Sequence, residues 1–348
     1  MENRNSYIEV YRILAVFSVL IIHYNGWFLG GLPDSFDFDN PTAHRIGQVI
    51  IASLCACCIN CFLLISGYFG INLRWQSIVK FLIQLMGVYI PWYFIDCIVN
   101  GCPIQLKCLI NNCLVISRGG YFVQCYFMLM LLSPVLNAFV ERFQKKVIWV
   151  VLLLLVSEFY FDCIIGNERM GFAHGYSVAH FCLVYLIGRT IFIYRDKIIG
   201  VKRYKWVLLY LTFACLIAWM YIAGIGFTFD YSNPLVITTG VFSFLPFIYK
   251  SGSNRIINWV ASGTFAVYLI QVCEPAFSFL CKMDKMLLEG NTYLLYLIKS
   301  IPLLIAFFMV CVLYDKLRAF CSTPLLRLTN RIGQSIIQYM TYLYRGKI

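Results

Sequence analysis

The 348-residue chain is strongly apolar, with 61% hydrophobic residues, only 13% charged residues and a mean hydropathy of +0.77. Soluble domains average about 25% charged residues, so the composition excludes an ordinary soluble protein and predicts an all-α polytopic membrane protein. The formal net charge of +12 does not indicate nucleic-acid binding, because the basic residues are distributed among loops on one expected side of the membrane.

Ten apolar segments are each about long enough to cross a bilayer as a helix. They lie at residues 8–29, 46–70, 78–100, 120–140, 146–165, 176–194, 204–224, 233–249, 262–281 and 293–314. The first segment lacks a small-residue cleavage site, so we interpret it as an uncleaved anchor. No loop is long enough for a separate domain. We therefore expect one transmembrane domain over residues 1–315, followed by a basic tail over residues 316–348.

The distribution of lysine and arginine predicts the orientation of the chain. With a cytoplasmic N-terminus, 21 of the 28 basic residues fall on the cytoplasmic side and six on the other, while Lys299 lies inside the last segment. The positive-inside rule therefore predicts that both termini are cytoplasmic. The tail after Asp315 carries six basic residues and no acid, so it either lies on the anionic inner leaflet or is a solvated basic tail.

Two ionisable residues in the first segment share one helix face. Arg12 and His23 are eleven positions apart, and eleven steps of about 100° end about 20° past three full turns. At about 1.5 Å per residue they lie about 16 Å apart, roughly half the thickness of the bilayer core. Because ionisable side chains are costly in hydrocarbon, the pair predicts a site that reaches two depths of the membrane.

Four other polar residues lie in the apolar segments, and each has a functional and a structural interpretation. Asp96 either serves the site or reaches water at the outer end of the third segment. Glu158 either pairs with a cation from another helix or is protonated. Glu274 precedes a proline that would kink the ninth segment beside a cavity. His180 begins the sixth segment, where histidine commonly caps a helix or reaches the interface. Two outer-loop histidines are solvated or face an acceptor: His44 and His174.

Most of the 16 cysteines lie inside apolar segments. The group formed by Cys55, Cys57, Cys58 and Cys61 has no nearby His or carboxylate in the sequence, so we expect small apolar side chains and no metal site. Three more cysteines share one interhelical loop and could form a disulfide if this loop faces an oxidising space: Cys102, Cys108 and Cys113.

The most specific motif is the segment YIEVYRILAVFSVLIIHY, in which ten residues separate Arg12 from His23. The second segment ends in FLLISGYF, with Ser66, Gly67 and Tyr68 in register with a Ser-Gly-Phe motif. By these two motifs the chain resembles the membrane-bound acyltransferase 3 family, whose members O-acylate bacterial surface polysaccharides, lipopolysaccharide and peptidoglycan. The resemblance covers essentially the whole chain.

Three further stretches are similar to this family, two of them with departures. KFLIQLMGVYIPWY resembles a basic helix start that leads to a proline, at Lys80 and Pro91, but Gln84 stands about where a second arginine is common. YFVQCYFMLMLLSPVLN resembles the fourth segment, which ends in Leu-Ser-Pro. GTFAVYLIQ resembles a late segment that ends in Tyr-Leu-Ile-His. Here Gln271 replaces the histidine, which puts any role of that histidine in doubt, although a glutamine still donates a hydrogen bond.

The resemblance implies an O-acyltransferase of the bacterial cytoplasmic membrane. It implies transfer of an acyl group, most commonly acetyl, from cytoplasmic acyl-coenzyme A to a hydroxyl of a cell-surface polysaccharide or lipid-linked glycan. Acyl-coenzyme A is then a co-substrate, and no cofactor is expected to be bound permanently. The other expected partners are the glycan and the lipid bilayer.

These expectations assign roles to the polar residues. His23 would act as general base on the acceptor hydroxyl or on an acyl-transfer intermediate, while Glu158 or Glu274 would orient its other ring nitrogen.

A second group of residues would bind the donor. Arg12, with Arg74 and Lys80, would bind the phosphates or the pantetheine end of coenzyme A. Ser66 would shape the passage rather than act as a nucleophile, because no base is visibly paired with it.

Two other functions would use the same residues. A proton-coupled glycan or lipid transporter or flippase would use the buried Arg, His and Glu as a binding site and proton relay. Matching broken helices in two halves of the chain would indicate this transporter, and no convincing internal repeat is visible. An inactive binding or assembly protein for polysaccharide machinery is the third interpretation. Arg12 and His23 argue against it, whereas Gln271 mildly favours it.

Overall fold

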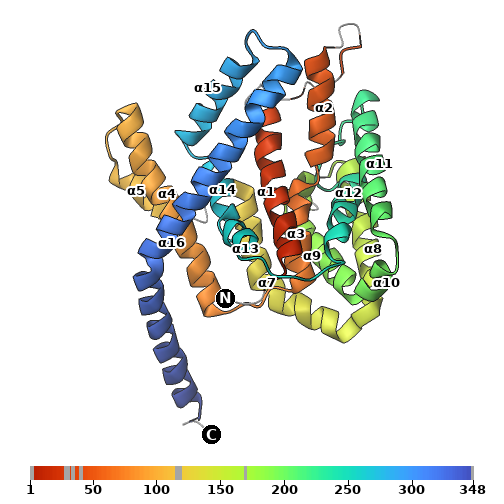
Figure 1. Cartoon of the computed structure of the whole chain (residues 1–348). Helices are drawn as coiled ribbons and strands as arrows, with labels where there is room; N and C mark the ends of the chain where they lie inside the picture. The colour runs from red at the N-terminus through yellow and green to blue at the C-terminus, as the bar shows by residue number, and fades with distance from the viewer. Residues whose placement is uncertain are drawn as a thin grey trace.

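Figure 1 shows the computed structural model of the chain, which is a bundle of helices. The N and C labels that mark the ends of the chain both lie in the lower half of the view. The structure describes residues 4–26, 32, 36–38, 42–113, 120–167 and 171–345, and these residues form helices, turns and loops without a strand. Within these ranges, six helices are long and apolar enough to cross a membrane, and three more apolar helices are shorter. The chain is an all-helical membrane protein with several passes. The count of ten spans and the side of the termini stay predictions.

The elements that position the site follow one another along the whole chain. The α-helices are α1 (Ser6–Asn25), α2 (Ala43–Cys55), α3 (Cys58–Phe69), α4 (Trp75–Asn100), α5 (Leu106–Cys113), α7 (Gly120–Phe143), α8 (Val147–Glu158), α9 (Val178–Ile193), α10 (Arg195–Ile199), α11 (Arg203–Ile222), α12 (Pro234–Phe244), α13 (Arg255–Ala261), α14 (Thr264–Ile270), α15 (Ala276–Leu288) and α16 (Tyr293–Arg345). Short 3₁₀ turns occupy Gln144–Lys146, Ala173–Gly175 and Leu245–Phe247, and a π-helix occupies Phe159–Ile164.

Several expected segments differ from the helices. The second segment is divided into α2 and α3, and the ninth is divided between α14 and α15. Pro275 lies in the second of these breaks, where its missing backbone N–H prevents α14 from continuing into α15. Lys316, the expected start of the tail, lies inside α16, which continues without interruption to Arg345.

Helix α1 lies between two clusters of buried apolar side chains. Ile8, Ala15 and Val19 belong to a cluster that α3, α9 and α12 share. Val16 and Leu20 belong to a second cluster, which α4, α14 and α16 share. Because both clusters include residues of α1, this helix is held from both sides, and its polar residues lie where the two halves of the bundle meet.

Helices α3 and α9 approach each other closely at two glycines. A Cβ atom added to Gly67 would lie 2.1 Å from the carbonyl oxygen of Tyr185, and one added to Gly188 would lie 2.5 Å from the carbonyl oxygen of Leu64. Both distances are far below a carbon–oxygen contact, so no side chain fits at either position without separating the helices. This requirement gives a physical reason for the glycine in the Ser-Gly-Tyr motif.

Candidate active site

Arg12 is held on α1 by an ion pair with Glu9. The Oε2 atom of Glu9 lies 3.1 Å from Nε of Arg12, and 34% of the Arg12 side chain is exposed compared with 5% of that of Glu9. Residues three positions apart share a helix face, so Glu9 orients the guanidinium. A guanidinium has five N–H donors, so this contact leaves donors for an anionic ligand.

A cavity of about 190 Å³ lies beside Arg12, between α1, α3, α4, α7 and α14. Its wall is otherwise mostly aromatic and consists of Phe62, Ile65, Ser66, Phe81, Phe122, Tyr126, Phe265 and Tyr268. The structure thus brings Arg12 and Ser66 together. The Oγ atom of Ser66 lies 3.2 Å from the hydroxyl of Tyr126, which is not a base at neutral pH. This contact favours the interpretation of Ser66 as a residue of the cavity wall over that of Ser66 as a nucleophile.

The other two expected donor-binding residues lie on the surface of α4. Arg74 directly precedes this helix and Lys80 lies in its second turn, and both are exposed. Lys80 is close enough to Lys316 for their charges to interact, and so are Arg4 and Arg318. Arg4 precedes α1, so this cationic group lies at the end of α1 that carries Arg12.

His23 lies eleven residues further along α1, where α14 ends. The buried amide of Gln271 interacts with its imidazole. Neither Oε1 nor Nε2 of Gln271 makes an aligned hydrogen bond within the part of the chain that the structure describes. The residue that departs from the family pattern is therefore the one that faces the proposed base. A neutral amide stabilises a protonated imidazole less than a carboxylate would.

Polar contacts fix the end of α1 around His23. The side-chain amides of Asn25 and Gln48 donate to each other's backbone carbonyls at 3.0 and 2.9 Å. Arg45 donates to Oε1 of Gln48 at 2.8 Å. The hydroxyls of Tyr24 and Ser300 lie 3.2 Å apart. These contacts connect α1 with α2 and α16, so they restrain the backbone that carries the imidazole.

Glu158 faces a different histidine from the one expected. Its carboxylate oxygens lie 3.0 and 3.2 Å from Nδ1 of His180, and Nε2 of His180 lies 2.8 Å from Oδ1 of Asn60. All three side chains are fully buried. Both ring nitrogens face oxygen atoms of these two partners. The expectation that Glu158 orients His23, and that His180 caps a helix or reaches the interface, is therefore replaced by a buried hydrogen-bonded pair of Glu158 and His180.

The other two acids make short-range contacts. Glu274 is exposed and accepts a hydrogen bond of 2.5 Å from Ser278, one turn along α15. It is not the buried acid that was expected to orient His23. Asp96 accepts a hydrogen bond of 2.6 Å from Asn100 at the end of α4. These contacts agree with the structural interpretation of Asp96.

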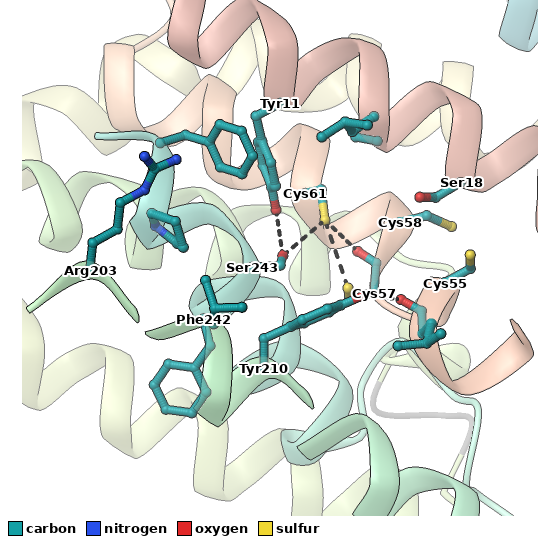
Figure 2. Close-up of a pocket in the computed structure, with 16 residues that line it drawn as sticks. Tyr11, Ser18, Cys55, Cys57, Cys58, Cys61, Arg203, Tyr210, Phe242 and Ser243 are labelled. Atoms are coloured by element: carbon teal, nitrogen blue, oxygen red, sulfur yellow. Dashed lines mark hydrogen bonds between the residues drawn. The ribbon is translucent and has the colours of Figure 1, made fainter. Parts of the chain in front are cut away.

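The cysteine group lines a second cavity, of about 360 Å³, on another face of α1 (Figure 2). The hydroxyl of Tyr11 lies 2.7 Å from Oγ of Ser243, and the thiol of Cys61 lies 3.8 Å from the same Oγ. Arg203 contributes the charged group of the lining. In the described ranges, no three His, Cys, Asp or Glu residues are arranged to hold a metal ion. The thiol of Cys102 lies 3.8 Å from the carbonyl oxygen of Asn100, and that of Cys108 lies 3.6 Å from Oε1 of Gln105. The expected disulfide cannot be assigned, since the side chain of Cys113 lies outside the described residues.

Several partners of the polar residues were not predicted from the sequence. Glu9 is visible as an acid three positions before Arg12. Asn60 is a polar residue within an apolar run, which is the only sequence signal of its contact with His180. Asp284 is fully buried and accepts a hydrogen bond of 2.6 Å from Tyr296, although its sequence position suggests an exposed loop. A contact between helices far apart in the sequence, such as that of Asn60 with His180, leaves no spacing pattern in a sequence.

Comparison with known proteins gives one match. The model of a family described as an acyltransferase domain matches residues 5–316, which is most of the chain. Neither the curated proteins nor the solved structures give a match. The matched range includes Arg12, Ser66, His23 and Gln271.

Proposed function

The chain belongs to the acyltransferase 3 family, and we propose that it is a membrane O-acyltransferase that uses acyl-coenzyme A. The acceptor is a hydroxyl of a cell-surface polysaccharide or lipid-linked glycan, the acyl group is most commonly acetyl, and the membrane is the bacterial cytoplasmic membrane. The observation that carries the proposal is the joint arrangement of α1 and α14. Arg12 and Tyr268 line one cavity, while His23 and Gln271 meet further along the same two helices.

The proposed reaction needs one base and one anion-binding group. His23 removes the proton from the acceptor hydroxyl, and the oxygen attacks the carbonyl carbon of the thioester. The new C–O ester bond forms as the C–S bond breaks, and the released thiolate of coenzyme A receives the proton. An imidazole suits this exchange because its ordinary pKa lies near neutral pH.

The donor would enter at the end of α1 that carries Arg4. The cationic group of Arg4, Lys80, Lys316 and Arg318 would attract the phosphates of coenzyme A, and Arg12 would bind its pantetheine end or a phosphate. The aromatic wall of the Arg12 cavity would exclude water from the pantetheine arm of the donor. This arm would extend past Ser66 toward His23, so that the thioester carbon meets the acceptor hydroxyl there.

A labelled donor tests the proposal. Membranes containing the chain would be incubated with acetyl-coenzyme A labelled in the acetyl group, and glycans would be extracted and analysed for label and for the mass of one acetyl group. We expect labelled glycan from membranes with the chain and none from membranes with His23→Ala, at equal protein levels. Unlabelled glycan that has moved across the membrane would support a transporter instead and would overturn the proposal.

A further inference from the structure

A separate polar cavity of about 430 Å³ lies at the end of α8 that is opposite Lys145 and Lys146. Its lining includes Asp162, His174 and Asp230, from three separate stretches of the chain, and the rings of Tyr176 and Phe227. The volume lies in the range of small-molecule sites. None of these residues lines the cavity beside Arg12.

Asp162 presents a buried carboxylate to this cavity. It lies in the π-helix that follows α8, and π turns frequently occur at functional sites. Only 4% of Asp162 is exposed. Its Oδ1 accepts a hydrogen bond of 3.1 Å from the backbone N–H of His174, but its Oδ2 has no hydrogen-bond partner among the described residues. A buried carboxylate oxygen without a donor is costly, so a ligand that donates to it gains affinity.

His174 is fixed next to Asp162 in the same wall. Its Nδ1 lies 2.8 Å from Oδ2 of Asp230, and its backbone has φ 56° and ψ 28°, in the left-handed region. Its carbonyl accepts a hydrogen bond of 3.2 Å from the N–H of Tyr231. Such a conformation is uncommon for a residue other than glycine, and the surrounding contacts must maintain it. Burial raises the pKa of Asp230, and the hydrogen bond with His174 opposes this shift in part.

The side chains in the wall indicate which kind of ligand could bind. The two carboxylates can accept hydrogen bonds from hydroxyl groups, the imidazole can donate or accept one, and the two aromatic rings offer apolar surface. The carboxylates of Asp162 and Asp230 would repel an anionic ligand.

We propose that this cavity binds a neutral sugar residue of the acceptor glycan, away from the hydroxyl that reacts. The inference rests on the proposed function in that the bound sugar belongs to the acceptor.

Direct binding tests the inference. Purified full-length protein would be applied to an array of neutral oligosaccharides built from hexoses, 6-deoxyhexoses and N-acetylhexosamines. Asp162→Asn keeps the shape of the side chain, and His174→Asn keeps a residue that tolerates the left-handed backbone. Asp196→Asn, on the exposed surface of α10, is the matched control for loss of a carboxylate.

We expect the wild-type chain to bind at least one array glycan and the Asp162 and His174 variants to bind it about tenfold more weakly or worse. Asp196→Asn should bind like the wild type. The inference is overturned if the wild type binds no neutral glycan, if it binds only cationic amines added as competitors, or if Asp162→Asn binds normally.

The two proposals fail separately. Glycan binding that depends on Asp162, in a protein that transfers no acyl group, would refute the enzyme and retain the sugar site. Acyl transfer with an unchanged KM for the glycan in Asp162→Asn would refute the sugar site and retain the enzyme.

Discussion

His180 and His23 are both embedded in the helical bundle, yet their surroundings give them different chemistry. His180 has oxygen acceptors at both ring nitrogens and is fully buried with Glu158 and Asn60. His23 meets the neutral amide of Gln271, at the point where α14 ends. A carboxylate partner keeps an imidazole protonated, and a protonated imidazole cannot act as a base. The side chain that contacts the imidazole, rather than the residue type or its burial, therefore distinguishes a structural histidine from a candidate catalytic one.

Alanine variants of the two histidines should lose different properties: that of His23 should lose activity, and that of His180 should lose stability. His23→Ala should lower the rate of acyl transfer by about 10²–10⁴-fold, the usual contribution of a general base, while leaving the melting temperature in detergent nearly unchanged. His180→Ala should lower the melting temperature first. A variant of His180 that melts normally but transfers no acyl group would reverse the two assignments.

Removal of the acid should affect stability strongly. Glu158→Gln removes the buried carboxyl group that lies 3.0 Å from Nδ1 of His180, and breaking a buried pair of this kind is expected to lower the free energy of unfolding by about 3–5 kcal/mol. Thermal melting of the purified protein measures this loss. Glu141→Gln, at an exposed position near the end of α7, is the matched control and should melt like the wild type. Equal melting of the two variants would show that the Glu158 pair contributes little.

Arg12 should affect donor binding rather than folding. Arg12→Ala removes the guanidinium from its cavity and should raise the KM for acyl-coenzyme A about tenfold or more, because charge-assisted hydrogen bonds to the donor are lost. Kinetics with varied donor concentration measure the change. Arg203→Ala, in the cysteine-lined cavity, is the control and should keep the wild-type KM. A similar increase for both variants would indicate a general effect of charge.

Gln271 should have a smaller effect on the turnover rate. Gln271→Ala removes a neutral partner of His23, which is worth about 0.5–1.5 kcal/mol, so kcat should fall about two- to tenfold. Gln271→His restores the residue of the family pattern and should retain more activity than Gln271→Ala. Equal activity of the wild type and Gln271→Ala would show that the amide does not orient the imidazole.

The pH dependence of the melting temperature should show a small contribution from Asp230, the acid that contacts His174. Burial raises the pKa of Asp230 above its ordinary value of about 4, so the folded chain holds this proton more tightly than the unfolded chain. Its contribution to stability is present below pH about 4 and is lost as the pH rises through the raised pKa. The melting temperature of the wild type should therefore fall relative to that of Asp230→Asn over this interval. Parallel melting curves for the two proteins at every pH would contradict the shift.

Part of the fold could be predicted from the sequence, because apolar length and helical spacing are local properties. The apolar segments gave the helical membrane architecture, although Pro275 and the break at Ala56 divide two of them. The spacing of Arg12 and His23 indicated two depths along one helix, and α1 runs unbroken through both residues.

The partners of the polar residues could not be predicted in the same way. The residues that flank Glu158 in the sequence do not indicate whether it contacts His23 or His180. The contact depends on how α8, α9 and α1 pack against one another. The same holds for Ser66, whose Tyr126 partner is 60 positions away. Contacts of this kind follow from packing between helices, for which periodicity along one helix carries no information.

The close approach of α3 and α9 has a consequence for how this chain tolerates sequence change. Gly67 and Gly188 leave no room for a methyl group, whereas a Cβ atom at Gly226 would meet nothing within 4 Å. In a library of single substitutions selected for accumulation in the membrane, the two helix-packing glycines should stay invariant and Gly226 should accept many residues. Evolutionary change would then be restricted at this helix–helix contact, which takes no part in any reaction, as strongly as at a residue that binds substrate.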